Sequence, residues 1–222
     1  MATLADVVSF CQARLGLPGF PDFPPAGNGL QVENDGTVTR IGAAVDAGLE
    51  PFRRAAAQGV DFLIVHHGLF WEPLRPIVGA TREKLALLVR ANLAIYSAHL
   101  PLDAHPEIGN NALLARRLRL EPVSTFHAFE GRDIGLIARG AIEREDLRRR
   151  LDSLFPRVVA IEFGSATPER VAVVTGAGAS AVDELRRAGV DTLITGELKE
   201  HLYNIAQELG LNLYACGHYA TE

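Results

Sequence analysis

Hydrophobic residues recur along the chain in two ways, three or four positions apart in some segments and in short continuous runs in others. Residues 4–15 show the first spacing and are followed by Gly16, so they predict an amphipathic helix. After a stretch at 16–29 that is rich in Pro and Gly, runs and spaced segments alternate. The runs predict strands at 41–45, 62–65 and 93–96, and the spaced segments predict helices at 49–58, 82–91 and 111–118. Alternating strands and helices indicate βαβ units and an α/β fold with mostly parallel or mixed sheets.

The second half of the chain repeats the pattern of the first. With an offset of 130 residues and no gap, segment 40–64 lies over segment 170–194, and both contain Gly-Val-Asp-x-Leu-Ile. Strand–helix–strand units converge on similar patterns, but this shared hexapeptide favours duplication over coincidence. We therefore expect two α/β repeats, one at 1–124 and one at 125–222. The second would include a joining subdomain at 125–165, with short strands and a charged helix at 142–155.

Composition narrows the class of protein. The 222 residues are 48% hydrophobic, which is enough for a core, and 22 basic against 27 acidic side chains give a net charge of −5. Mild acidity argues against a surface built for phosphate backbones, so nucleic acid is not an expected partner. We find neither a signal peptide nor a run of about 20 apolar residues, which indicates a cytoplasmic protein without a membrane partner. The cysteines, Cys11 and Cys216, form no Cys-x-x-Cys pair, and reduced thiols are a simpler interpretation than a disulfide.

Side chains that bind metals follow two predicted strands of the first half. His66 and His67 come directly after the run at 62–65, where a strand that gives way to a loop would let two adjacent imidazoles reach two different ions. His99 and Asp103 follow the run at 93–96, and Pro101 between them predicts a turn-like loop. Because ligands bind beyond the carboxyl ends of parallel strands, we expect these groups to lie near a binding site.

A third cluster follows the run at 211–215. His218 and Glu222 are four positions apart, which places both side chains on one face of a helix. Imidazole and carboxylate together suit Zn, Mn or Fe(II), and a carboxylate can bridge two cations. The three clusters predict a site for a pair of divalent metal ions with the ligands His66, His67, Asp103, His218 and Glu222.

Five other features admit both a functional and a structural interpretation. The Gly-rich stretch 175–180 resembles a phosphate cradle after a strand, but it lacks a full GxGxxG and a Walker lysine, which favours a tight turn. Cys216 near His218 suggests a nucleophile, whereas its apolar neighbours favour a core residue. His105 and His127 are interpreted as structural. His201 follows the equivalent of the His66 strand in the second repeat, so it could line the cleft without binding metal.

Five motifs resemble one known family from about residue 25 to the end. The sequence is similar to the GTP cyclohydrolase I type 2 homologs, or NIF-three-like dinuclear metal-centre proteins, and most of all to their short bacterial branch. The family continues beyond the last motif by a turn of helix and a strand, whereas this sequence ends at Glu222. The motifs are Asn28-Gly-Leu-Gln-Val32, Val65-His-His-Gly-Leu-Phe-Trp71, His99-Leu-Pro-Leu-Asp-Ala-His-Pro-Glu-Ile-Gly-Asn-Asn111, Ile194-Thr-Gly-Glu197 and Ala215-Cys-Gly-His-Tyr-Ala-Thr-Glu222.

The resemblance carries expectations about assembly and site. It implies two intertwined repeats, a homohexameric toroid and a two-metal site that faces its interior. The family's ligands fall on the five residues named above, with Glu222 as the bridge between the ions. His99 matches a family position close to the site.

Three functional hypotheses follow. Pairs of metal ions about 3.5–4 Å apart are common in the active sites of hydrolases. We therefore favour a metal-dependent hydrolase that acts on a small molecule containing a phosphate or a purine. The family name implies GTP cyclohydrolase activity, which opens a ring of GTP. The third hypothesis is a non-enzymatic metal-binding hexamer that serves as a scaffold or metallochaperone. In a hydrolase, His99 and His201 are the candidates for proton transfer.

Overall fold

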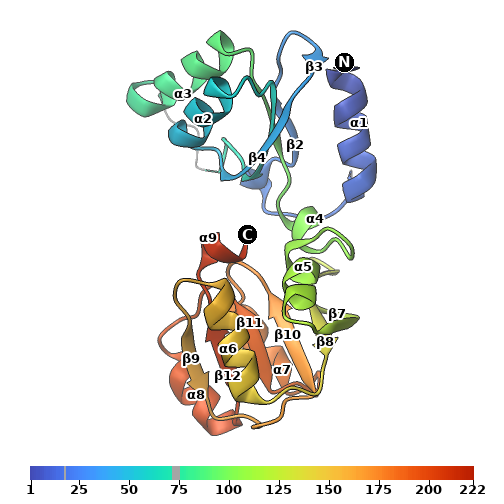
Figure 1. Cartoon of the computed structure of the whole chain (residues 1–222), viewed down its shortest axis with the longest axis vertical. Coiled ribbons are helices and arrows are strands. Elements are labelled where there is room, and N and C mark those ends of the chain that lie inside the picture. The colour runs from blue at the N-terminus through green and yellow to red at the C-terminus, as the bar shows by residue number, and fades with distance from the viewer. Residues whose placement is uncertain (18, 72–75) are drawn as a thin grey trace. The chain divides into compact units, whose positions relative to one another are not determined.

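The computed structural model describes residues 1–17, 19–71 and 76–222, which form two compact units, Met1–Leu102 and Asp103–Glu222. Each unit is a sheet with helices on both faces (Figure 1). The division precedes the boundary predicted after residue 124, because helix α5 (Asn110–Arg117) packs on the sheet of the second unit. Among the described residues, every helix is too short or too polar to span a bilayer.

The first unit is built on a four-stranded sheet with the order β2-β6-β5-β4. The last three strands are parallel to one another, and β2 is antiparallel to β6. Its strands are β2 (Gly29–Val32), β4 (Ile41–Asp46), β5 (Phe62–His67) and β6 (Ala94–Ser97), beside a small pair of β1 (Ala2–Thr3) and β3 (Thr37–Val38). Helices α2 (Leu49–Ala57) and α3 (Gly79–Arg90) cover one face of the sheet, and α1 (Leu4–Leu15) packs on the other.

Helix α1 confirms the prediction for residues 4–15. The Thr3 hydroxyl accepts a hydrogen bond from the backbone N–H of Asp6 at 3.1 Å, which caps the first turn. Gly16 has a left-handed φ of 68° and ends the helix. Both ends of the helix are therefore determined by local sequence.

The second unit has a six-stranded mixed sheet with the order β7-β8-β10-β11-β12-β9. Strands β10, β11 and β12 are parallel, and the others are antiparallel to their neighbours. Its strands are β7 (Glu121–Phe129), β8 (Arg132–Arg139), β9 (Val159–Glu162), β10 (Arg170–Val174), β11 (Thr192–Thr195) and β12 (Asn212–Ala215). Helices α5 and α6 (Arg144–Leu154) pack on one face, and α7 (Val182–Leu185) and α8 (Leu202–Leu209) on the other.

The two sheets confirm the predicted duplication. The order β2-β6-β5-β4 in the first unit has its counterpart in β9-β12-β11-β10 in the second, with the same strand directions. A side-chain contact is repeated as well, because the guanidinium of Arg40 donates to the carbonyl of Gln58 and that of Arg170 donates to the carbonyl of Ala188. Each contact joins the start of a strand to the segment after the following helix.

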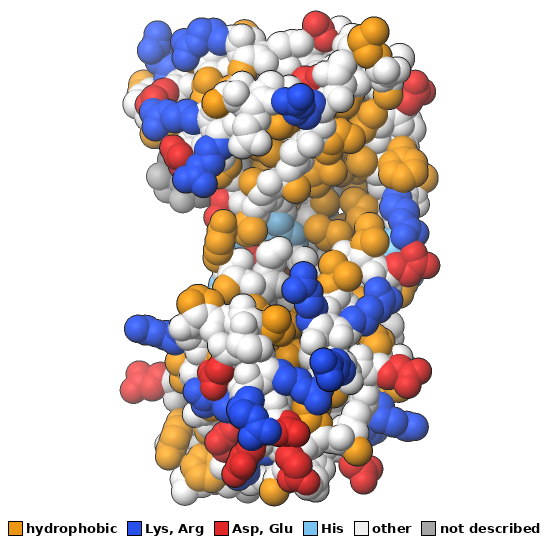
Figure 2. Space-filling model, in the orientation of Figure 1, with side chains coloured by type: hydrophobic (Ala, Val, Ile, Leu, Met, Phe, Trp, Pro, Cys, Tyr) orange, Lys and Arg blue, Asp and Glu red, His pale blue; other side chains and the backbone are white. Residues whose placement is uncertain are grey.

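The predicted joining subdomain is only partly correct. Strands β7 and β8 form a hairpin of nine and eight residues, not short strands, and β8 pairs with β10, which makes the hairpin part of the second sheet. Helix α6 has the predicted charged face, where Arg148 and Asp152 form an ion pair at 2.9 Å. Figure 2 shows basic and acidic side chains together on the surface of the second unit. Leu147 and Leu151 of the same helix are fully buried in the core.

Candidate metal centre

His66 and His67 are the last two residues of β5, and both are part of the strand. The sequence placed them in a loop, which is wrong, because β4 continues to Asp46 and pairs there with His67. The pairing is extended by the Ala47 N–H, which donates to the His67 carbonyl at 2.9 Å. The two imidazole rings lie with centroids 4.9 Å apart, and His66 is buried.

Both rings are held through Nδ1. In His66 this atom lies 2.9 Å from the Ala98 carbonyl oxygen, and in His67 it lies 2.8 Å from Oδ1 of Asp46. Because each partner is an acceptor, Nδ1 carries the proton and Nε2 presents its lone pair. Metal-binding histidines are usually oriented in this way.

His99 forms a buried pair with Asp22. Its Nδ1 lies 2.8 Å from Asp22 Oδ1, and both side chains are less than a tenth exposed. The carboxylate also accepts hydrogen bonds from the N–H of Leu100 and the amide of Asn28. Burial raises the pKa of Asp22, but the hydrogen bonds and the charge of His99 outweigh it and hold this pKa below its usual value. Sequence analysis missed Asp22, which lies far from His99 in the chain and outside the motifs.

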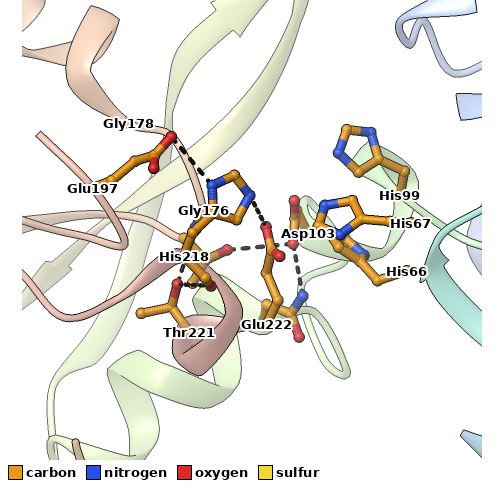
Figure 3. Close-up of polar contacts among 12 residues, drawn as sticks. His66, His67, His99, Asp103, Gly176, Gly178, Glu197, His218, Thr221 and Glu222 are labelled. Atoms are coloured by element: carbon orange, nitrogen blue, oxygen red, sulfur yellow. Dashed lines mark hydrogen bonds and ion pairs between the residues drawn. The ribbon is translucent and has the colours of Figure 1, made fainter. Parts of the chain in front are cut away.

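Three histidines of the first unit form a cluster. One ring nitrogen from each of His66, His67 and His99 lies within 4.8 Å of the others, a grouping that could hold a metal ion. The ring centroids of His66 and His99 are 4.9 Å apart, and Figure 3 shows the three rings side by side. The structure therefore brings His99 to the two histidines at the end of β5.

Asp103 lies in a single helical turn, α4 (Leu100–Asp103), and not in the predicted loop. Pro101 is compatible with a helix here, because the first turn needs no N–H from it. Asp103 is 6% exposed, and its Oδ1 accepts from the Asn110 amide at 2.8 Å and the Thr175 hydroxyl at 3.3 Å. Asn111, the last residue of the same motif, donates to the Asp103 backbone carbonyl at 2.9 Å.

His218 and Glu222 share one face of the last helix, α9 (His218–Thr221), as predicted. Nε2 of His218 lies 3.0 Å from Glu222 Oε1, and its Nδ1 lies 3.2 Å from Glu197 Oε1 (Figure 3). The hydrogen bond with Glu222 contributes most to raising the pKa of His218 to about 9, against the effect of partial burial. Glu197 was missed as a functional residue, although its motif, Ile194–Glu197, was recognised.

The Gly-rich turn after β10 makes room for α9, which supports the tight-turn interpretation. Gly176 has a φ of +65°, and a β-carbon there would lie 2.4 Å from Glu222 Oε1. Its N–H donates to the Thr221 hydroxyl at 3.1 Å. At Gly196, a β-carbon would lie 2.5 Å from the Gly176 carbonyl oxygen and 2.7 Å from His218 Cα. The role of these glycines depends on tertiary contacts, so no local sequence pattern predicts it.

The remaining candidates are structural or exposed. Cys216 is buried in the core, which raises the pKa of its thiol to about 12, and both cysteines are free thiols. His105 accepts from the backbone within its own turn, and His127 contacts Glu184 at 2.8 Å. His201 is exposed at the start of α8, and its side chain has no hydrogen bond in the described part of the chain.

Residues 3–222 match the family Duf34/NIF3 (NGG1p interacting factor 3). The chain belongs to this family. The GTP cyclohydrolase 1 type 2 homolog of Archaeoglobus fulgidus is a relative with 39% identity over 219 residues, which are 99% of this chain and 88% of the relative. This agrees with the resemblance found in the motifs.

Two solved structures to which the chain is similar have the same fold. Protein ybgI, a protein of unknown function, is 34% identical with a TM-score of 0.90, and the match covers 99% of this chain and 88% of ybgI. The protein TTHA1606 from Thermus thermophilus is 39% identical with a TM-score of 0.86 and the same two coverages. The fold and the family are therefore shown by sequence and structure together.

The carboxylate behind His67 offers a first test. Replacing Asp46 by alanine should weaken the binding of Zn²⁺ or Mn²⁺ about 10- to 100-fold, because the His67 ring loses the acceptor that fixes its orientation and tautomer. Isothermal titration of the metal-free protein measures this. Glu50→Ala is the matched control, since that exposed carboxylate pairs with Arg54 of its own helix and not with a histidine of the cluster in the described part of the chain. Equal affinities of the two variants would contradict the assignment.

Proposed function

We propose that the protein binds two divalent metal ions and acts as a metal-dependent hydrolase on a small molecule that contains a phosphate or a purine. The proposal rests on the way in which the rings of four histidines are oriented by hydrogen bonds. In each, Nδ1 lies within 3.2 Å of an acceptor, which leaves Nε2 to face other groups. The acceptors for His66, His67, His99 and His218 are Ala98, Asp46, Asp22 and Glu197, respectively.

The chemistry of the donors fits the proposed metals. Imidazole nitrogen and carboxylate oxygen together suit Zn, Mn and Fe(II). We assign His66, His67, Asp103, His218 and Glu222 as the ligands, and the negative charge of the two carboxylates offsets part of the charge of two cations. A pair of divalent ions would supply Lewis acidity and lower the pKa of water.

His99 is the residue to which we assign proton transfer. Asp22 holds its ring through Nδ1, so that Nε2 can accept a proton and pass it on. The same geometry, a carboxylate behind an imidazole, orients general bases in hydrolases. The exposed His201, the second candidate, has no hydrogen-bond partner among the described residues that would orient it.

The proposal predicts separate effects of His99 on turnover and on metal content. His99→Ala should lower turnover about 10²- to 10⁴-fold and leave the metal content nearly unchanged, because it removes a proton acceptor and no ligand. The assay is a panel of nucleotides and phosphoesters with the Mn, Zn and Fe(II) forms, alongside elemental analysis. His105→Ala is the control. Loss of metal in His99→Ala would instead make His99 a ligand.

GTP ring opening is the second candidate, because a relative that is 39% identical carries the name GTP cyclohydrolase 1 type 2 homolog. Ring opening of GTP that is absent in His66→Ala would establish it. A panel that stays blank with fully metallated protein would refute the hydrolase and leave the non-enzymatic scaffold or metallochaperone.

A further inference from the structure

Two aromatic side chains of the first unit lie exposed beside its histidine cluster. Phe23 is 46% exposed and Trp71 is 37% exposed, and their rings meet edge to face with centroids 6.3 Å apart. The indole also lies edge to face with the His99 ring, with centroids 4.7 Å apart, and 5.6 Å from the ring of His67. We call Phe23 and Trp71 the aromatic pair.

One side chain ties together the two segments that carry the aromatic pair. The Gln31 amide nitrogen donates to the carbonyls of Ala26 and Gly27, in the turn after Phe23, at 3.1 Å each. Its amide oxygen accepts from the N–H of Leu69, two residues before Trp71, at 2.7 Å. Gly68 leaves the space for this amide, since a β-carbon there would lie 2.2 Å from Gln31 Nε2.

Asp22 adds a second restraint. Its Oδ1 accepts from the backbone N–H of Phe23 at 2.7 Å and also contacts Nδ1 of His99. The backbone of Phe23 is therefore held by the same carboxylate oxygen that orients the imidazole of His99. An aromatic surface held in place before binding loses little conformational entropy when a ligand arrives.

We propose that the aromatic pair is a stacking platform for the planar heteroaromatic ring of the ligand, a nucleobase. Exposed Trp and Phe rings can stack on any nucleobase, because every base has a π-face. The edge-to-face packing of Trp71 on His99 fixes the orientation of the indole next to the imidazole nitrogens. A ring that stacks here lies next to imidazole nitrogens, so a polar group on the same molecule can reach them. The stacking itself needs only the first unit, whereas hydrolysis of the bound molecule rests on the proposed function.

Trp71 reports on this platform directly, because it is the only tryptophan of the chain. The experiment titrates the metal-free full-length protein with guanosine, adenosine and uridine, and follows intrinsic fluorescence. We expect saturable quenching by the nucleosides and none by ribose 5-phosphate. Phe23→Leu should weaken the apparent affinity about tenfold, the effect of losing one base-stacking contact. Gln31→Leu should also weaken the apparent affinity for nucleosides, because the substitution removes the amide hydrogen bonds that join the two segments.

The matched control is Phe70→Leu, which removes an aromatic ring that is 55% exposed directly before Trp71 and outside the pair. The inference is overturned if nucleosides cause no saturable quenching, if ribose 5-phosphate quenches equally, or if Phe70→Leu weakens binding as much as Phe23→Leu. Metal binding is measured on the same variants. Intact metal binding without a nucleoside response would refute the platform alone, and nucleoside binding without metal binding would refute only the metal centre.

Discussion

Replacing His66 by alanine should weaken the affinity for divalent metal by more than about 100-fold and abolish any turnover. Loss of an orienting partner behind a ligand costs about 10- to 100-fold, and loss of the ligand itself should cost more. His66 is 4% exposed, and its Nδ1 bond to the Ala98 carbonyl fixes the ring. The smaller alanine side chain leaves no other nitrogen at this position.

The measurement is metal stoichiometry after dialysis against trace Zn²⁺ or Mn²⁺, together with isothermal titration. His127→Ala is a suitable control, because that histidine of β7 contacts Glu184 of α7 and Ser180 of the turn before it, and none of these is a proposed ligand. A His66→Ala protein that keeps the full metal content would remove His66 from the ligand set. An equal loss in both variants would indicate a general loss of folding.

Replacing Gly196 by alanine should cost about 1–3 kcal/mol or more in the free energy of unfolding and weaken metal binding as well. The added β-carbon would lie 2.5 Å from the Gly176 carbonyl oxygen and 2.7 Å from His218 Cα. Both are backbone atoms, so a rotamer change does not relieve the overlap. Helix α9 would have to shift and carry the His218 imidazole with it.

Urea unfolding and metal titration of this variant test the argument together. Gly42→Ala is the control, since the three atoms nearest to its β-carbon would be methyl carbons of Val60 and Leu63, at 3.1–3.2 Å, and not backbone atoms. We expect a smaller loss of stability and unchanged metal affinity there. If Gly196→Ala retained wild-type stability and affinity, the close packing of α9 on this glycine would not matter for the site.

The sequence predicted the elements well where local signals and periodicity act together. Helix α1 begins and ends as expected because Thr3 caps it and Gly16 terminates it. The repetition of the strand–helix–strand unit followed from the shared Gly-Val-Asp motif, whereas the order of the strands came only with the structure. The hairpin β7–β8 was underestimated because its length depends on pairing with β10, a contact that no local pattern encodes.

Site residues divide in the same way. His218 and Glu222 were placed on one face because helical spacing alone decides it. The strand assignment of His66 and His67 failed, since pairing of His67 with Asp46 extends β5 beyond its apolar run. Asp22 was missed because a carboxylate distant in sequence approaches His99 only in the folded chain.

The most direct test of the metal centre is anomalous scattering from crystals grown with Zn²⁺ or Mn²⁺. We predict two peaks of anomalous density. Nε2 of His66, His67 and His218 and the carboxylate oxygens of the two acidic ligands should lie about 2.0–2.3 Å from the metal ions. The expected ligands are His66, His67, Asp103, His218 and Glu222. Metal ions bound by other residues would contradict the proposed centre. So would separate and distant ions, one bound by donors of the first unit and one by donors of the second.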